Sequence, residues 1–177
     1  MDLGANVGFT LIYYKKKFAD SNLACVEPIE ENIDQLRKNL KHNTINAHVF
    51  HGAISIVDGF ADMELGEKDC LHHVKGFSDN AAMGNANKKI VKAYSMETIL
   101  RTLHWDKIDL LKIDIEGYEE ELLLKNNEWL QKVNVMIMEI HSNFKLNDLY
   151  NLAEKNNFNI IQHSSGNWVL TRKNMVI

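Results

Sequence analysis

Short apolar runs alternate along the chain with longer segments in which apolar residues recur every three or four positions. Five runs have the length and composition of strands: 23–26, 47–51, 90–94, 110–113 and 133–141. Three segments between them carry the stripe of an amphipathic helix: 29–40, 96–103 and 146–152. We expect the last one to turn Leu146, Leu149 and Leu152 toward the core. Strands that alternate with helices predict an α/β fold with a mostly parallel sheet.

A glycine-containing stretch, Asp-Leu-Gly-Ala-Asn-Val-Gly, occupies residues 2–8. We expect a strand that ends at Asp2 or Leu3, a tight turn, and a helix from about Val7 to Lys17. Glycine permits the left-handed conformation and close backbone approach, and a helix N-terminus offers N–H groups to an anionic group. Doubly wound folds bind nucleotides at such a turn, at the carboxyl end of a parallel strand. Only Met1 precedes this strand, so it should be short or trimmed.

An acid ends the apolar run 23–26. Glu27 lies 23 residues after Gly4, close to the separation of about 20 at which an acid accepts hydrogen bonds from ribose hydroxyls. The alternative is an acid that the dipole favours at a helix N-terminus. Pro28 then opens a helix, whose buried stripe would be Ile29, Ile33, Leu36 and Leu40.

Further acids follow the later strands. Asp114 and Glu116 come after the run 110–113, and Glu139 and His141 end the run 133–141. Because parallel strands end at one edge of a sheet, both pairs should open onto one crevice beside the glycine turn. Burying acids there costs folding free energy unless they are ion-paired, hydrogen-bonded or needed for function. The alternative is a structural histidine and a helix N-terminal acid cluster, with solvated charges at Glu119, Glu120 and Glu121.

Together these stretches resemble the FkbM family of class I S-adenosylmethionine (SAM) O-methyltransferases. The similar motifs are the glycine turn, Val-Glu-Pro at 26–28, Leu-Lys-Ile-Asp-Ile-Glu-Gly at 111–117 and Glu-x-His at 139–141. The resemblance covers roughly Asp2 to Thr171. It implies a Rossmann-like class I methyltransferase fold, with helices on both faces of a mostly parallel central sheet. A C-terminal antiparallel hairpin would close the sheet, formed by 157–162 and 168–171.

The resemblance also implies methyl transfer from SAM to a hydroxyl of a carbohydrate, a glycan or a small molecule. The expected cofactor contacts are Asp2, Gly4, Ala5, Asn6, Gly8, Glu27, Pro28, Ala53 and Asp114. The expected substrate contacts are Glu139 and His141. A hydroxyl needs a base to take its proton, and the candidates are His141, Asp114 and Glu116. A divalent metal, which no sequence feature demands, would be held by Asp114, Glu139 and His141.

The segment from 56 to 89 is the least regular. Residues 60–65 predict an edge strand, and 69–87 predict a long loop at the border of the acceptor site. The adjacent His72 and His73 would not share a helix face, so neither is expected to bind a metal. Ser95 should cap a helix whose buried positions are Met96, Ile99, Leu100 and Leu103.

Composition narrows the class of protein. The 177 residues suggest one domain, 1–177, and 45% apolar residues with a net charge of −4 suit an ordinary globular core. This charge offers no general case for nucleic acid or membrane partners. No segment reads as a membrane span or a signal peptide, so a cytoplasmic location is expected. The two cysteines, Cys25 and Cys70, form neither a disulfide framework nor a zinc pattern. The sequence leaves the oligomeric state open.

Two other functions remain to be weighed. A nucleotide-dependent oxidoreductase would carry Gly-x-Gly-x-x-Gly, and the third glycine is missing here. A catalytically inactive SAM-binding domain that acts through partners stays open because the first strand is so short.

Overall fold

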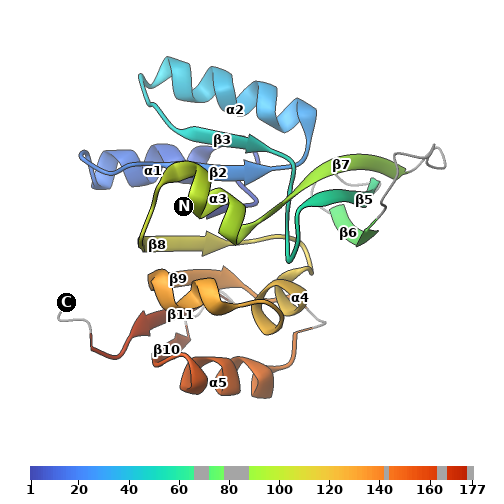
Figure 1. Cartoon of the computed structure of the whole chain (residues 1–177). Helices are drawn as coiled ribbons and strands as arrows, with labels where there is room; N and C mark the ends of the chain where they lie inside the picture. Colours follow the sequence, from blue (N-terminus) through green and yellow to red (C-terminus); the bar gives the residue numbers. More distant parts are fainter. Residues whose placement is uncertain (66–71, 78–87, 142–143, 163–166, 175–177) are drawn as a thin grey trace.

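A seven-stranded sheet forms the centre of the computed structural model, which describes residues 1–65, 72–77, 88–141, 144–162 and 167–174 (Figure 1). The strand order is β10-β11-β9-β8-β1-β2-β3. The strands are β1 (Asp2–Leu3), β2 (Ala24–Glu27), β3 (His48–His51), β8 (Ile108–Ile113), β9 (Val133–Glu139), β10 (Phe158–Gln162) and β11 (Asn167–Arg172). Strands β1, β2, β3, β8 and β9 are parallel, whereas β11 is antiparallel to both of its neighbours. The mostly parallel sheet and the closing hairpin are therefore confirmed.

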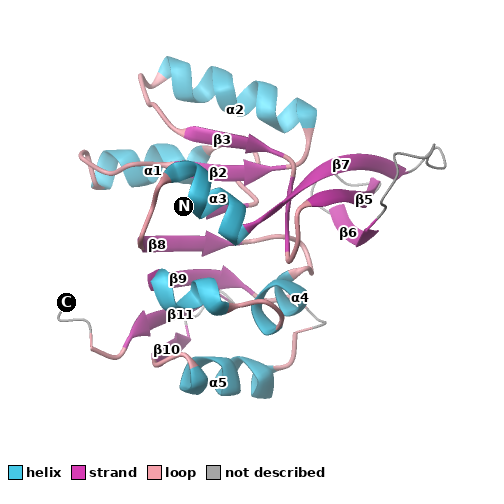
Figure 2. Cartoon of the chain, in the orientation of Figure 1, coloured by secondary structure: helices cyan, strands magenta, loops and turns pink. Residues whose placement is uncertain are grey.

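Helices cover both faces of this sheet (Figure 2). They are α1 (Phe9–Lys17), α2 (Glu30–His42), α3 (Met96–Leu103), α4 (Glu119–Leu124), α5 (Leu146–Lys155) and the 3₁₀ helix η1 (Glu128–Lys132). Cys25 packs with residues of α1 and α2, while Ala24 and Val26 pack with residues of α3, α4 and α5. Because successive strand residues point to opposite faces, the two helix groups lie on opposite sides. Among the described helices, none combines the length and apolar character needed to cross a membrane.

The first strand has only two residues, yet it lies in the middle of the sheet. Leu3 pairs with Val26 of β2 on one side and with Ile113 of β8 on the other. Its side chain is fully buried, as expected for a parallel strand covered on both faces. The carboxyl ends of β1, β2 and β8 therefore meet at one edge of the sheet, and the glycine turn starts there.

A second sheet of four strands lies beyond this edge (Figure 1). It contains β4 (Ala53–Ser55), β5 (Gly59–Leu65), β6 (His72–Phe77) and β7 (Lys88–Ser95), in the order β4-β7-β5-β6. The strand predicted at 60–65 is confirmed as β5, but its predicted edge position is wrong, because β5 pairs with β7 on one side and β6 on the other. Strand β6 also replaces part of the loop predicted at 69–87. The rest of that loop, with Cys70, lies outside the described residues.

The helices agree with the sequence patterns except near their first residues. Ser95 caps α3 as predicted, because its hydroxyl accepts a hydrogen bond from the Thr98 N–H at 3.2 Å. Helix α1 begins at Phe9 rather than Val7, because Gly8 adopts the left-handed conformation before it. Leu146 is 48% exposed, so its predicted inward position is wrong. It is the first residue of α5, and the buried stripe of this helix is formed by Leu149, Leu152 and Ala153.

Candidate functional site

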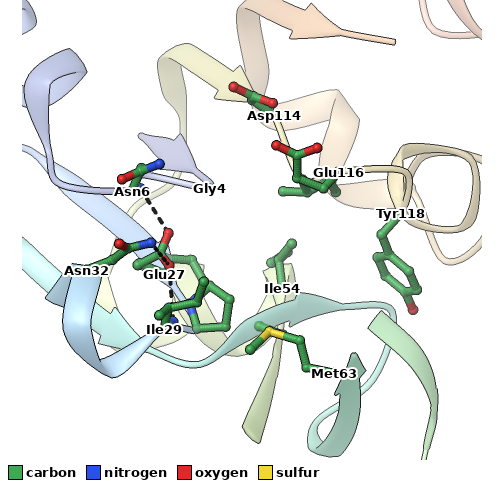
Figure 3. A pocket seen from close by; sticks show the side chains of 14 residues that line it. Gly4, Asn6, Glu27, Ile29, Asn32, Ile54, Met63, Asp114, Glu116 and Tyr118 are labelled. Carbon is green, nitrogen blue, oxygen red and sulfur yellow. Dashed lines mark hydrogen bonds between the residues drawn. The ribbon is translucent and has the colours of Figure 1, made fainter. Parts of the chain in front are cut away.

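A pocket opens where β1, β2 and β8 end, between the two sheets (Figure 3). The space between its walls, including the open mouth, is about 690 Å³. Of the predicted cofactor contacts, six line it: Gly4, Asn6, Glu27, Pro28, Ala53 and Asp114. Asp2, Ala5 and Gly8 are buried outside this lining. The other lining residues are Val26, Ile29, Asn32, Ile54, Met63, Ile115, Glu116 and Tyr118.

The glycine turn closes on the protein itself. Gly4 and Ala5 donate their N–H groups to the Val26 carbonyl at 3.1 and 3.2 Å, and Gly8 donates to Ala5 at 2.9 Å. Asn6, which is left-handed with φ 49°, donates its N–H to the Glu27 carboxylate at 2.8 Å. These four N–H groups of the turn are thus used within the fold. The expected donors to an anion are those of the helix N-terminus, where α1 begins at Phe9. The turn instead fixes the position of Glu27.

Packing between elements explains the two glycines. A Cβ atom added at Gly4, where φ is +79°, would lie 1.8 Å from the backbone oxygen of Asp114. A Cβ atom at Gly8, where φ is +83°, would lie 3.0 Å from Cγ of Leu36 on α2. Gly4 therefore lets the turn touch the end of β8, and Gly8 lets α1 approach α2.

Glu27 is the most enclosed charged side chain of the pocket lining, with only 4% of its surface exposed. Its Oε1 accepts hydrogen bonds from the Ile29 N–H at 3.0 Å and from Asn32 Nδ2 at 3.1 Å. Its Oε2 accepts only the bond from Asn6. Because a carboxylate has about four acceptor sites, Oε2 keeps capacity for a hydroxyl from the pocket. The sequence interpretation missed Asn32, whose signal is a polar residue in the first turn of the helix after the acid.

Lys112 joins the glycine turn to the end of β8. Its Nζ lies 3.4 Å from Oδ1 of Asp2 and 3.2 Å from Oδ2 of Asp114. Burial raises the pKa of Asp2 to about 6, although Lys112 pulls it down. Burial lowers the pKa of Lys112, but Asp2 and Asp114 outweigh it and the pKa lies above its ordinary value. The polar residue that interrupts this buried strand in the sequence therefore holds two carboxylates.

His141 lies between two glutamates, of which Glu116 lines the pocket; His141 and Glu139 themselves are not among the lining residues. Its Nδ1 is 2.9 Å from Oε1 of Glu119, and its Nε2 is 3.3 Å from Oε2 of Glu116. Glu119 is fully buried, so the interpretation of this residue as a solvated charge is wrong. The reason is local: the turn after β8 folds back, and Oε1 of Glu119 accepts the N–H groups of Ile115 and Gly117, each at 3.2 Å.

Charges around His141 oppose the effect of its burial. Burial lowers the pKa of His141, but Glu119, Glu116 and Glu139 together raise it above its ordinary value. Burial also raises the pKa of Glu116, and the neighbouring carboxylates of Asp114, Glu139 and Glu119 add to this while His141 opposes it. Three carboxylates thus act on one imidazole. Such perturbed groups beside a pocket are typical of a site for proton transfer.

The same cluster contains the described residues that are best placed to meet a metal ion. One ligand atom each from Asp114, Glu116 and His141 lies within 4.8 Å of the others. Glu116 thus takes the place expected for Glu139, which is exposed at the end of β9. Charge compensation argues for protons rather than a metal here. Lys112 already pairs with Asp114, and both ring nitrogens of His141 face carboxylates.

The fold is similar to solved methyltransferase structures. Methyltransferase FkbM from Methylobacillus flagellatus KT superposes with a TM-score of 0.65 and 15% identity, over 97% of this chain and 43% of that chain. M. capricolum TrmK, in complex with S-adenosyl-homocysteine, gives a TM-score of 0.52 and 12% identity, over 98% of this chain and 61% of that chain. These similarities confirm the expected Rossmann-like class I methyltransferase fold.

Sequence comparison adds a curated relative and a family. Methyltransferase sdnD from Sordaria araneosa is 26% identical over 166 residues, which cover 77% of this chain. The chain spans 64% of that relative's length. The profile of the Methyltransferase FkbM domain matches residues 2–160, which is most of the chain, so the protein belongs to the FkbM methyltransferase domain family.

Proposed function

We propose that the protein is a SAM-dependent O-methyltransferase that acts on a hydroxyl of a carbohydrate, a glycan or another small molecule. One observation carries this proposal. The enclosed carboxylate of Glu27 and the acidic wall formed by Asp114 and Glu116 lie across one pocket (Figure 3). Membership of a methyltransferase family gives the reaction class. A structural neighbour that holds S-adenosyl-homocysteine supports SAM as the methyl donor.

The pocket fits the chemical groups of SAM. Glu27 has acceptor capacity left on Oε2 for a ribose hydroxyl. Apolar side chains at Ile29, Ile54 and Met63 offer a surface for a flat base. Asp114 and Glu116 place negative charge on the opposite wall, where it would favour a cation. When bound, SAM supplies a methyl group activated by a positively charged sulfur.

The acceptor side of the site favours a neutral hydroxyl. A hydroxyl becomes a good nucleophile only when a base takes its proton. Glu116 lines the pocket and lies 3.3 Å from His141 Nε2, so a base is within reach of the pocket wall. Carboxylates accept hydrogen bonds from the several hydroxyls of a sugar. The same negative charge would repel the phosphates of a nucleic acid. Substrate contacts by Glu139 and His141 are part of this proposal.

A catalytically inactive SAM-binding domain is the second candidate, since binding and turnover are separate properties. The oxidoreductase alternative receives no support from the family or from the motif. The chain spans only part of the length of its relatives, so the activity and the acceptor of the whole protein belong to this proposal.

The test has two stages. Calorimetric titration of the chain with SAM, S-adenosyl-homocysteine and NAD should show binding of the first two and none of the third. Transfer of labelled methyl from SAM should then be measured with a panel of sugars, glycans and simple alcohols. Binding of S-adenosyl-homocysteine with no transfer to any acceptor would support the inactive domain. Binding of NAD alone would overturn the proposal.

A further inference from the structure

We propose that Glu119 and His141 form a carboxylate–imidazole pair, in which His141 takes the proton of the acceptor hydroxyl and Glu119 positions the imidazole. This inference rests on the proposed methyl transfer and adds a division of roles within the site. Glu119 is 22 residues from His141 in the sequence, and the two side chains meet at 2.9 Å. Nothing in the sequence pattern distinguishes Glu119 from the two glutamates that follow it.

The position of Glu119 is fixed by its surroundings. Its side chain is fully buried, and one oxygen accepts two backbone N–H groups as well as the bond from His141 Nδ1. The turn residue Glu116 has φ 53° and Gly117 has φ 98°, which brings these N–H groups around the carboxylate. A buried carboxylate on one ring nitrogen sets the tautomer and orientation of an imidazole. The other ring nitrogen, Nε2, is thereby directed to Glu116, which lines the pocket.

The other candidate bases are placed less favourably. Asp114 pairs with Lys112 through Oδ2, at 3.2 Å, so this oxygen is already engaged. Glu116 lines the pocket and lies beside Nε2, where it can accept a hydrogen bond from the acceptor and stabilise the imidazolium. The charged groups that act on His141 are Glu119 of α4, Glu116 and Asp114 after β8, and Glu139 at the end of β9.

The proposed step conserves protons and charge. The hydroxyl proton moves to Nε2 of His141 as the hydroxyl oxygen bonds to the methyl carbon. The carbon–sulfur bond breaks, its electron pair stays on sulfur, and the positive charge of the sulfur is lost. The new imidazolium carries that charge between Glu119 and Glu116 until water removes its proton. A neutral His141 is required at the start, so turnover should rise with pH through the pKa of His141.

The decisive variant is Glu119→Gln, because glutamine keeps the size and can still accept the two backbone bonds. The matched control is Glu120→Gln, on the next residue of α4, which is partly exposed. We expect SAM affinity within a few-fold of wild type in both. Turnover should fall by roughly 10²–10⁴ in Glu119→Gln alone. The rise of turnover with pH should move to lower pH, because an amide cannot stabilise the imidazolium.

A measurement without turnover keeps the inference testable if no acceptor is found. Nuclear magnetic resonance of labelled histidine should show the pKa of His141 falling in Glu119→Gln and unchanged in Glu120→Gln. If Glu119→Gln melts far below wild type, a double-mutant cycle that combines it with His141→Gln tests whether the two residues act as a pair. If the two residues act as a pair, the double variant should lose less turnover than the sum of the losses in the two single variants. Its melting temperature should likewise fall by less than the sum of the two single shifts.

An unchanged pH profile and an unchanged pKa of His141 in folded Glu119→Gln would overturn the pair. That result differs from failure of the proposed function, in which the wild type would bind no SAM or transfer no methyl group. It also differs from a purely structural role of Glu119, which would lower the melting temperature but leave the pH midpoint in place.

Discussion

Gly4 and the backbone oxygen of Asp114 lie so close that a Cβ atom on Gly4 would be 1.8 Å from that oxygen. The Asp114 N–H also donates a hydrogen bond to the Leu3 carbonyl at 3.1 Å. The glycine turn and the acidic end of β8 are therefore one packed unit, which joins the Glu27 side of the pocket directly to the side with Asp114 and Glu116.

Gly4→Ala should destabilise the fold by more than about 4 kcal/mol, because backbone atoms on both sides must move. Gly8→Ala is the control, since its φ is also left-handed but its new Cβ would meet only the flexible side chain of Leu36, at 3.0 Å. Urea unfolding followed by circular dichroism measures both. Equal losses in the two variants would contradict the packing argument. A Gly4→Val variant would be expected to unfold for the same reason. Loss of SAM binding in that variant would therefore not show that Gly4 contacts the cofactor.

Stability should depend on pH through Asp2. Its pKa is raised from 3.8 to about 6 in the folded protein, so the folded state holds the proton more tightly than the unfolded chain. The stabilisation is complete below about 3.8 and is lost as the pH rises through about 6. Asp2→Asn should flatten this part of the curve of urea midpoint against pH. If wild type and Asp2→Asn show the same slope of urea midpoint against pH, groups other than Asp2 cause the pH dependence.

Strands and helices were predictable because each depends on a local pattern of apolar residues. The importance of Glu27 was also predictable from the sequence, since an acid after the second strand has few other uses. Glu119 was not, because its burial depends on a turn that folds back and on a histidine from another strand. The interior position of β5 depends likewise on pairing with distant strands. The role of Gly4 was assigned to the ligand, whereas a strand end distant in sequence demands it.

Removal of metal ions should leave methyl transfer unchanged. Oδ2 of Asp114 already faces the ammonium group of Lys112 at 3.2 Å, so a cation bound there would have to displace or repel Lys112. The measurement compares turnover before and after treatment with a chelator, and after addition of Mg²⁺ or Mn²⁺. Activity that disappears with the chelator and returns with the metal would show instead that Asp114, Glu116 and His141 bind it.

The last prediction concerns the cofactor. Glu27→Gln should lower SAM affinity at least about tenfold, because a charge-assisted hydrogen bond to ribose is worth about 1.5–3 kcal/mol. Glutamine is preferred to alanine, which would leave the N–H groups of Asn6 and Ile29 without their acceptor. Glu30→Gln is the control, since this exposed side chain pairs only loosely with His51, at 3.8 Å.

A third variant separates binding from positioning. Asn32→Ala removes one donor to Glu27 but keeps the carboxylate, so its affinity for SAM should lie between those of wild type and Glu27→Gln. Calorimetry gives the affinities, and melting curves without ligand show whether each variant is folded. A folded Glu27→Gln protein that binds SAM as tightly as wild type would remove Glu27 from the ribose site. The same affinity in Asn32→Ala and wild type would mean that the backbone N–H groups of Asn6 and Ile29 alone hold the carboxylate in place.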